Sequence, residues 1–257
     1  MIEITIITVV KNNLEGIRKT MKSIRSQVFN NFEHIIIDSN SSDGTSDFIR
    51  ENLNHQTIHI RENDSGIYEA INKGVKLSKG KFIGLLHSGD IYFSKSTLKY
   101  IFQNLNNFDY IFGNIAYFKN KKIKRLWNFS QSEKLSPLKI PHTSLFIKKE
   151  IIDDLNYYDK NFKISSDTDF LIRLSKKPYR YQKIEDYIIY MEAGGVSFSS
   201  SNFFKKAKED LIILFRYYRF LFIFYYIYKI VIKFCGFNLI LNKEEFKILE
   251  KNFLNII

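Results

Sequence analysis

The chain has 257 residues, of which 45% are hydrophobic, 16% aromatic and 26% charged, a composition typical of a globular protein and not of a disordered one. Its length predicts one elaborated domain, or one domain with an appended segment. A lone cysteine, Cys235, excludes a disulfide framework and a cysteine-based zinc site. The first ten residues read as a strand and not as a secretion signal, so we expect a cytoplasmic protein.

The balance of 39 Lys and Arg against 27 Asp and Glu gives a net charge of +12. A positive surface of this size attracts the phosphates of nucleic acid, of anionic lipid or of a nucleotide substrate. No recognition-helix or zinc-finger pattern accompanies the charge, so we do not expect nucleic acid as a partner.

Strand and helix patterns alternate along the first third of the chain. The β-branched run of residues 2–10 predicts a strand buried on both faces, and apolar residues at helical spacing predict a helix over residues 14–27. The same logic predicts further strands at 34–38, 57–61 and 81–86, with helices at 44–52 and 67–78. This order favours an α/β fold with a mostly parallel central sheet and flanking helices.

The later chain is less regular. Strands are predicted over residues 108–118 and 143–147, and a helix over 167–175. After residue 202 the sequence becomes dense in Phe, Tyr, Ile and Leu interleaved with Lys and Arg. We therefore predict a sheet domain over residues 1–202 and a helical, aromatic and basic region over 203–257.

Carboxylates follow three successive strands of the predicted sheet. Asp38 and Asp43 flank one polar loop, Asp64 follows the next strand, and Asp90 follows the one after that. Concentrated acids at one sheet edge favour a metal-bound nucleotide as the ligand, because a cation or a donor-rich ligand offsets their repulsion. The alternative for Asp43, or its neighbour Ser42, is that it only caps the following helix.

Four motifs at these strand ends resemble family 2 glycosyltransferases of the GT-A fold. They are Thr-Val-Val-Lys-Asn at 8–12, Asp-Ser-Asn-Ser-Ser-Asp-Gly-Thr at 38–45, Glu-Asn-Asp-Ser-Gly-Ile-Tyr-Glu-Ala-Ile-Asn-Lys-Gly at 62–74 and Leu-His-Ser-Gly-Asp at 86–90. The Pro141-His142 pair and Gly194-Gly-Val-Ser197 resemble enzymes that build bacterial O-antigen and capsule repeat units.

The resemblance implies an inverting transfer from a nucleotide-diphosphate sugar, with UDP as the expected nucleotide. Asp38 would match the carboxylate that holds the nucleoside base, with Asp64 near the base or ribose. Asp90 would match the last acid of the metal-binding Asp-x-Asp motif, whose first position is Ser88 here. With one protein ligand, the diphosphate and water must complete the shell of Mg²⁺ or Mn²⁺. Lys73 either reaches a phosphate or is a solvated lysine.

The segment Ser165-Ser-Asp167-Thr-Asp169 resembles the family's Glu-Asp-x-Asp block, whose first Asp matches the general base. Asp167 is therefore the expected base and Asp169 the second option. The alternative is that Asp167 only supplies charge at a helix N-terminus. His142 is a second candidate for contact with acceptor or diphosphate, although a single His more often has a structural role. Trp127 either stacks on a sugar ring or belongs to a surface flap.

The aromatic C-terminal region indicates membrane association. Residues 220–232, about 20 Å long as a helix, are too short to span a hydrocarbon core of roughly 30 Å. A helix lying in the interface is favoured, with seven basic residues available to anionic lipid: Lys205, Lys206, Lys208, Arg216, Arg219, Lys229 and Lys233. A buried cap on the sheet domain is the alternative.

These patterns together predict a glycosyltransferase at the inner face of the cell membrane that uses a lipid-linked saccharide as acceptor. The competing hypothesis is a non-catalytic protein that binds nucleotide sugar or anionic lipid. A nucleotidyltransferase is disfavoured because residues 11–14, Lys-Asn-Asn-Leu, form no glycine-rich phosphate loop.

Overall fold

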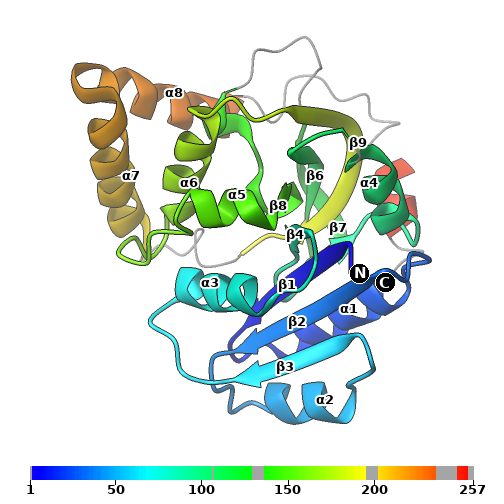
Figure 1. Ribbon diagram of the computed structural model, residues 1–257. Helices are drawn as coiled ribbons and strands as arrows, with labels where there is room; N and C mark the ends of the chain where they lie inside the picture. The colour runs from blue at the N-terminus through cyan, green and yellow to red at the C-terminus, as the bar shows by residue number, and fades with distance from the viewer. Residues whose placement is uncertain (1, 106, 129–135, 195–201, 236–247, 254–257) are drawn as a thin grey trace.

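The computed structural model of the chain describes residues 2–105, 107–128, 136–194, 202–235 and 248–253. Among these residues one sheet of nine strands runs in the order β3-β2-β1-β4-β8-β6-β9-β5, and β7 pairs with the outer part of β6. Helices cover both faces of the sheet (Figure 1). The predicted α/β fold class with a mostly parallel central sheet is confirmed.

The first half of the sheet is parallel. Its elements are β1 (Ile4–Val10), α1 (Leu14–Arg25), β2 (Phe32–Asp38), α2 (Thr45–Glu51), β3 (Thr57–Arg61), α3 (Ile67–Leu77) and β4 (Phe82–Leu85). Val10 pairs with Asp38 and Asp38 with Arg61, so the carboxyl ends of β1, β2 and β3 lie level. The polar loops that follow these strands therefore share one edge, as the sequence pattern predicts.

The second half of the sheet is mixed. Its elements are β5 (Ile91–Tyr92), α4 (Thr97–Leu105), β6 (Tyr110–Lys119), β7 (Lys122–Trp127), η1 (Pro137–Lys139), η2 (His142–Ser144), β8 (Phe146–Lys148), α5 (Lys149–Asp154), α6 (Ser166–Ser175) and β9 (Tyr181–Glu192). β8 runs antiparallel to both β4 and β6, whereas β9 runs parallel to β6. β8 thus joins this half to β4 of the parallel half.

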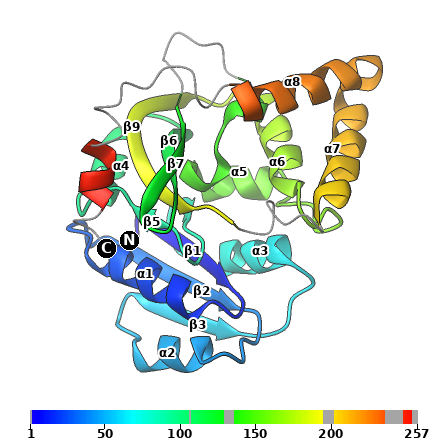
Figure 2. The same cartoon turned by 180° about the vertical axis from the view of Figure 1, so that it is seen from behind.

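Alternate residues of the buried strands serve two different cores. Ile7 and Ile35 pack with residues of α3, α5 and α6 on one face. Ile36 packs with α1 and α2 on the other face, and Ile6 packs with α1 and α4. Figure 2 shows α1 and α2 covering the face opposite α3. Burial on both faces explains why these strands read as continuous apolar runs and not as alternating ones.

One predicted strand is shorter than expected. Residues 143–147 were expected to extend, but His142–Ser144 form a 3₁₀ turn and the strand begins only at Phe146. Ser144 explains the turn, because its N–H and its hydroxyl both donate to the carbonyl of Pro141. The turn aims His142 toward α6 instead of along the sheet.

The C-terminal region forms α7 (Phe203–Tyr218), η5 (Arg219–Leu221) and α8 (Phe222–Cys235). By length and composition alone, residues Phe203–Val231 are long and apolar enough to cross a membrane. The chain changes direction at Arg219, whose φ of 43° ends α7, so α7 and α8 are two helices set at an angle (Figure 1). A short helix at 248–253 returns to the sheet, where Leu249 and Phe253 are buried.

Candidate active site

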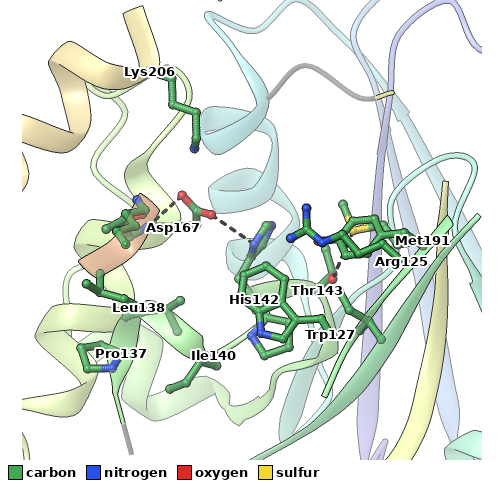
Figure 3. Close-up of a pocket in the computed structure, with 16 residues that line it drawn as sticks. Arg125, Trp127, Pro137, Leu138, Ile140, His142, Thr143, Asp167, Met191 and Lys206 are labelled. Carbon is green, nitrogen blue, oxygen red and sulfur yellow. Dashed lines mark hydrogen bonds and ion pairs between the residues drawn. The ribbon is translucent and has the colours of Figure 1, made fainter. Parts of the chain in front are cut away.

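An open cavity lies between the outer sheet strands and the C-terminal helices. Its walls come from β6, β7, the segment around η1 and η2, α6, α7 and α8. Most of the lining is apolar, and its charged side chains are Asp167, Arg125, Lys206 and Lys229 (Figure 3). A cavity with a largely apolar wall and a few convergent charges is the usual form of a ligand site.

Asp167 stands in the first turn of α6 and faces this cavity. Its Oδ2 lies 3.2 Å from Nδ1 of His142, and its Oδ1 accepts from the N–H of Thr168 at 2.8 Å. Burial favours the neutral acid, but the charge and hydrogen bond of His142, followed by the charges of Lys206 and Lys229, outweigh it. They hold the pKa of Asp167 well below its usual range, so the group is a carboxylate.

Tyr68 on α3 provides a further contact to Asp167. Its hydroxyl lies 2.7 Å from the carbonyl oxygen of Ile164 and 3.2 Å from Oδ1 of Asp167. Burial first, and then the negative charge of Asp167, raise the pKa of Tyr68 well above its usual value. The phenol therefore stays protonated and remains a hydrogen-bond donor. The sequence pattern placed Tyr68 in a family motif without assigning it this contact.

Asp169, the second candidate base, lies elsewhere. It is 1% exposed, and its carboxylate binds Nε of Arg173 at 2.8 Å and the hydroxyl of Tyr217 at 2.8 Å. Two positions along a helix turn a side chain by about 200°, so Asp167 and Asp169 cannot share a face. Asp169 joins α6 to α7, and its expected role as an alternative base stays a prediction that this geometry does not favour.

Asp38 ends β2 as predicted, but its side chain points inward. It is 0% exposed, and it accepts hydrogen bonds from the N–H of Ser41, at 2.9 Å, and from the hydroxyl of Ser46. Although burial favours the neutral form, these hydrogen bonds hold the pKa of Asp38 below its usual range. Asp38 thus fixes the β2–α2 loop, and its direct contact with a nucleoside base stays a prediction that this geometry does not favour.

Asp43 lies exposed at the far end of the same loop. Its carboxylate accepts from the N–H of Thr45 at 3.1 Å and from the N–H of Leu14 at 3.3 Å. The hydrogen bond with Thr45 is the main reason that the pKa of Asp43 lies below its usual value. Asp43 therefore stabilises the start of α2, whose N-cap is Gly44, and ties it to α1.

Asp64 and Lys73 both belong to the loop and helix that follow β3. Asp64 accepts from the N–H of Gly66 at 3.0 Å, and Gly66 has a φ of 143°. Lys73 donates to the carbonyl of Asn63 at 2.8 Å and pairs with Glu62 at 3.2 Å. Lys73 thus holds the loop that presents Asp64, and its predicted contact with a phosphate is untested.

Ser88 and Asp90 occupy the turn between β4 and β5. Asn13 of the β1–α1 loop donates to the carbonyl of Ser88 at 3.2 Å, which links the two loops. Asp90 is 3% exposed; its Oδ1 accepts from the N–H of Glu192 at 2.9 Å, whereas its buried Oδ2 has no hydrogen-bond partner among the described residues. Burial raises the pKa of Asp90 to about 8.

This unpartnered oxygen fits a divalent cation. An isolated buried carboxylate is unfavourable unless a positive charge offsets it, and oxygen is the ligand that Mg²⁺ and Mn²⁺ prefer. No group of three or more His, Cys, Asp or Glu side chains in the described parts of the chain is arranged to hold a metal. Asp90 would therefore be the residue that binds the cation, and the diphosphate of a bound nucleotide would supply further oxygens.

His87 lies beside this turn and next to the candidate base. Its ring centroid is 5.9 Å from that of His142, and burial lowers the pKa of His87 to about 3. A neutral His87 adds no charge to the pocket of Asp167. Its two buried ring nitrogens have no hydrogen-bond partner among the described residues.

The C-terminal helices complete the site. Glu209 of α7 accepts the N–H groups of Lys163, Ile164 and Ser165 at 2.8 to 3.0 Å, which fixes the entry to α6. Lys229 of α8 pairs with Asp210 at 2.8 Å and donates to Thr168 at 2.7 Å. The region after residue 202 thus positions the neighbours of Asp167.

These contacts revise the set of lipid-facing basic residues. Lys229 is engaged with Asp210, Lys206 faces the cavity, and Arg216 lies 3.4 Å from Asp169. Of the seven basic residues considered, Lys205, Lys208, Arg216 and Arg219 are exposed, and the side chain of Lys233 lies outside the described residues. Residues 195–197 of the glycine motif lie outside them as well.

Trp127 and Arg125 form an aromatic and cationic wall of the cavity. The guanidinium of Arg125 lies 4.8 Å from the ring of Tyr117 and 5.6 Å from the ring of Trp127. Trp127 donates its indole N–H to the carbonyl of Lys139 at 2.9 Å. The basic composition of this stretch was the only signal for Arg125, and nothing in the sequence singled out Lys206 or Lys229 as cavity residues.

Comparison with known proteins gives a consistent result. The family described as Glycosyl transferase family 2 matches residues 5–166. A PGL/p-HBAD biosynthesis glycosyltransferase of Mycobacterium bovis (strain BCG / Pasteur 1173P2) is 25% identical over 185 residues, which cover 69% of this chain and 72% of the relative. An uncharacterized glycosyltransferase of Rickettsia bellii is 31% identical over 117 residues, 45% of this chain and 17% of the relative.

Two solved structures share the fold. S. aureus TarS 1-349 in complex with UDP-GlcNAc has a TM-score of 0.66 and 17% identity, covering 99% of this chain and 72% of the other. The mannosyltransferase PcManGT from Pyrobaculum calidifontis, in complex with GDP-Man and Mn²⁺, has a TM-score of 0.65 and 15% identity, covering 99% and 73%. At this identity the likeness establishes the fold alone.

Proposed function

The chain belongs to glycosyl transferase family 2 and is a nucleotide-sugar-dependent glycosyltransferase. From this premise we propose that it transfers the sugar of a UDP-linked donor, with inversion at the anomeric carbon, to a hydroxyl of a lipid-linked saccharide. The reaction takes place at the inner membrane surface, in bacterial surface polysaccharide synthesis. The observation that carries the proposal is Asp167, which lies at the cavity wall as a carboxylate in contact with His142.

Inversion is supported by the number of acids in the cavity. Asp167 is the sole carboxylate among the described residues that line it. A retaining mechanism through a covalent intermediate uses a second nucleophile on the opposite side of the sugar, and the described wall offers no second carboxylate for that role. A single displacement by the acceptor hydroxyl needs only one base.

In this proposal the acceptor hydroxyl loses its proton to Asp167 as its oxygen bonds to the anomeric carbon. The bond between that carbon and the diphosphate oxygen breaks, and its electron pair leaves with the diphosphate. His142 holds the carboxylate of Asp167 at 3.2 Å, and Tyr68 donates to its other oxygen. These two contacts fix the orientation of the base.

The donor side of the proposal rests on the loops at the carboxyl ends of the strands. Asp64 and Lys73 lie at the edge where a parallel sheet presents ligands, and the Asp38 loop adjoins them. TarS and PcManGT, which share the fold, were solved with UDP-GlcNAc and with GDP-Man. A divalent cation held by Asp90 would neutralise charge on the leaving diphosphate.

Membrane association is proposed from exposed apolar surface. Among the described residues, twelve of the eighteen exposed large hydrophobic side chains lie between residues 203 and 231. Phe220 is 93% exposed and Phe224 70%, which is costly in water and favourable at a lipid interface. Lys205, Lys208 and Arg219 supply exposed positive charge on the same helices.

The proposal is tested by incubating the full chain with a panel of nucleotide sugars, Mn²⁺ and liposomes that carry a polyprenyl-diphosphate saccharide. Mass spectrometry of the extracted lipid should show one added sugar for one donor of the panel. Donor binding without added sugar or donor hydrolysis under any of these conditions would favour the non-catalytic alternative.

A further inference from the structure

The cavity beside Asp167 is lined by more cationic side chains than carboxylates. Three cationic side chains line it, Arg125, Lys206 and Lys229, against the single carboxylate of Asp167. They come from β7, α7 and α8 respectively, so three separate elements converge on one space. Convergence of cations from separate elements indicates a ligand with negative charge.

The partners of these cations differ. Lys229 is neutralised by Asp210 at 2.8 Å and hydrogen-bonded to Thr168, so its charge is used inside the protein. Arg125 is held between the rings of Tyr117 and Trp127, with its charge at the cavity wall.

Lys206 has no such close contact, although its charge acts on the carboxylate of Asp167. It is half-buried, and it takes part in no hydrogen bond or ion pair with any residue that the structure describes. Figure 3 shows its side chain reaching from α7 toward the space in front of Asp167. A partly desolvated ammonium gains most from an anion placed within hydrogen-bond distance.

We propose that Lys206, together with Arg125, binds the phosphate group that joins the acceptor's saccharide to its lipid. This inference rests on the proposed function and names the acceptor feature that the cavity recognises. In the proposed function the donor's diphosphate is bound at Asp90, so we assign the anion at Lys206 to the acceptor.

The orientation of α7 supports a lipid phosphate in particular. Phe204 lies two positions before Lys206, on the opposite side of α7, and is 83% exposed, and the neighbouring Phe203 is 64% exposed. Exposed aromatic side chains beside a cation that faces the cavity place Lys206 where a lipid headgroup meets the protein. Leu138 and Ile140 at the cavity wall suit the first carbons of the lipid.

Trp127 makes this binding measurable, because it is the single tryptophan of the chain and lines the cavity. We would follow its fluorescence in the full chain while adding undecyl phosphate in neutral dodecyl maltoside micelles, with undecanol in the same micelles as the uncharged match. Saturable change is expected with undecyl phosphate only. Lys206→Gln should raise its Kd about tenfold or more, as expected for the loss of one charge-assisted hydrogen bond. Lys208→Gln, on the exposed side of α7, should leave the Kd within twofold.

Further titrations separate the possible sources of phosphate. Inorganic pyrophosphate and UDP with Mn²⁺, added to wild type and to Lys206→Gln, report on free phosphate and on the donor. The proposal predicts that the variant binds UDP with Mn²⁺ as wild type does. It is overturned if Lys206→Gln weakens UDP as much as undecyl phosphate, if Lys208→Gln is equally impaired, or if undecanol binds as tightly as undecyl phosphate. If the wild type binds undecyl phosphate as predicted but transfers no sugar, the result counts against the proposed function and not against the phosphate site.

Discussion

Lys229 of α8 donates to Thr168 at 2.7 Å, and Thr168 is the residue directly after the proposed base. The same ammonium pairs with Asp210 of α7 at 2.8 Å. The two C-terminal helices are thereby bonded to the first turn of α6, so the exposed apolar surface of α7 and α8 and the candidate base belong to one packed unit. Membrane contact and catalysis are expected to be structurally linked in this protein.

Replacing the candidate base is the first prediction. Asp167→Asn keeps the size of the side chain but removes the proton acceptor, so turnover should fall by at least about 10²-fold while donor binding stays unchanged. Asp169→Asn is the matched control, because Asp169 is buried and bonded to Arg173 and Tyr217. That variant should lower the melting temperature and retain most of the turnover of its folded fraction. Equal loss of turnover in both variants would contradict the assignment.

The pH dependence of the reaction is the second prediction. His142, Lys206 and Lys229 outweigh the effect of burial and hold the pKa of Asp167 well below its usual range. The kcat/KM of the wild type should therefore stay constant as the pH falls to values below the ordinary pKa range of carboxylates. His142→Ala removes the nearest positive charge while burial remains. The pKa of Asp167 should then rise, and the acid limb should move to higher pH. A wild-type limb near pH 6.5 that disappears in the variant would instead make His142 the base.

Metal dependence is the third prediction. Asp90→Asn removes the charge that would hold the cation and keeps the shape of the buried side chain. Calorimetric titration with UDP should show tighter binding with Mn²⁺ in wild type and no effect of Mn²⁺ in the variant. Asp43→Asn, at an exposed position of the neighbouring loop, should behave as wild type. Full retention of the Mn²⁺ effect in Asp90→Asn would remove Asp90 from the metal role.

Membrane attachment is the fourth prediction, and it is better tested by surface substitutions than by truncation. Truncation after residue 202 would remove Glu209, which fixes the entry to α6, and Leu249 and Phe253, which are buried against the sheet. Phe220→Ser with Phe224→Ser changes only exposed side chains. The double variant should keep its melting temperature and lose sedimentation with anionic liposomes. The control, Leu53→Ser with Leu77→Ser, should sediment as wild type; identical sedimentation of both double variants would sink the proposal.

Acid sensitivity of the fold is the fifth prediction. His34 on β2 is fully buried, and burial first, then the charge of Arg25, lower its pKa to about 3. The unfolded chain binds this proton below about pH 6.5, whereas the folded chain does not bind it until about pH 3. Stability should therefore fall as pH falls from 6.5 toward 3, by at most about 1.4 kcal/mol per pH unit for this group.

Urea midpoints measured at pH 7.5, 6.0 and 5.0 test this slope. His34→Gln retains a polar partner for Thr8 and should reduce the dependence of stability on pH. Some dependence should remain in this variant, because the pKa of His87 is also lowered to about 3. His55→Gln at an exposed position should give the wild-type slope. The prediction fails if His34→Gln and wild type lose stability equally on acidification.

The sheet's first half was predictable because its signals are local. Continuous β-branched runs such as residues 4–10 and apolar spacing such as that of α3 require no knowledge of distant partners. β9 was missed because polar and charged residues interrupt its pattern, and only its pairing with β6 makes a strand of Tyr181–Glu192. Strands defined by long-range pairing have weak signatures in sequence.

The site was predictable only in part, for a similar reason. Asp167 was identified from a motif, but its contact with His142 joins positions 25 residues apart and depends on the turn at η2. The sequence pattern indicates lipid binding for Lys206 and Lys229, but in the structure both line the cavity, and Lys229 also donates to Thr168. A helix face can be inferred from spacing, but the partner of that face cannot.

The stereochemistry of the first product tests the central claim most directly. Proton NMR would follow the anomeric signal while the full chain hydrolyses an α-linked UDP sugar in the presence of Mn²⁺. The spectra are recorded before the anomers of the released sugar equilibrate. The account predicts that the β anomer forms first with wild type and that Asp167→Asn forms it at least about 10²-fold more slowly. Initial formation of the α anomer, or undiminished turnover by Asp167→Asn, would contradict an inverting transfer that uses Asp167 as its base.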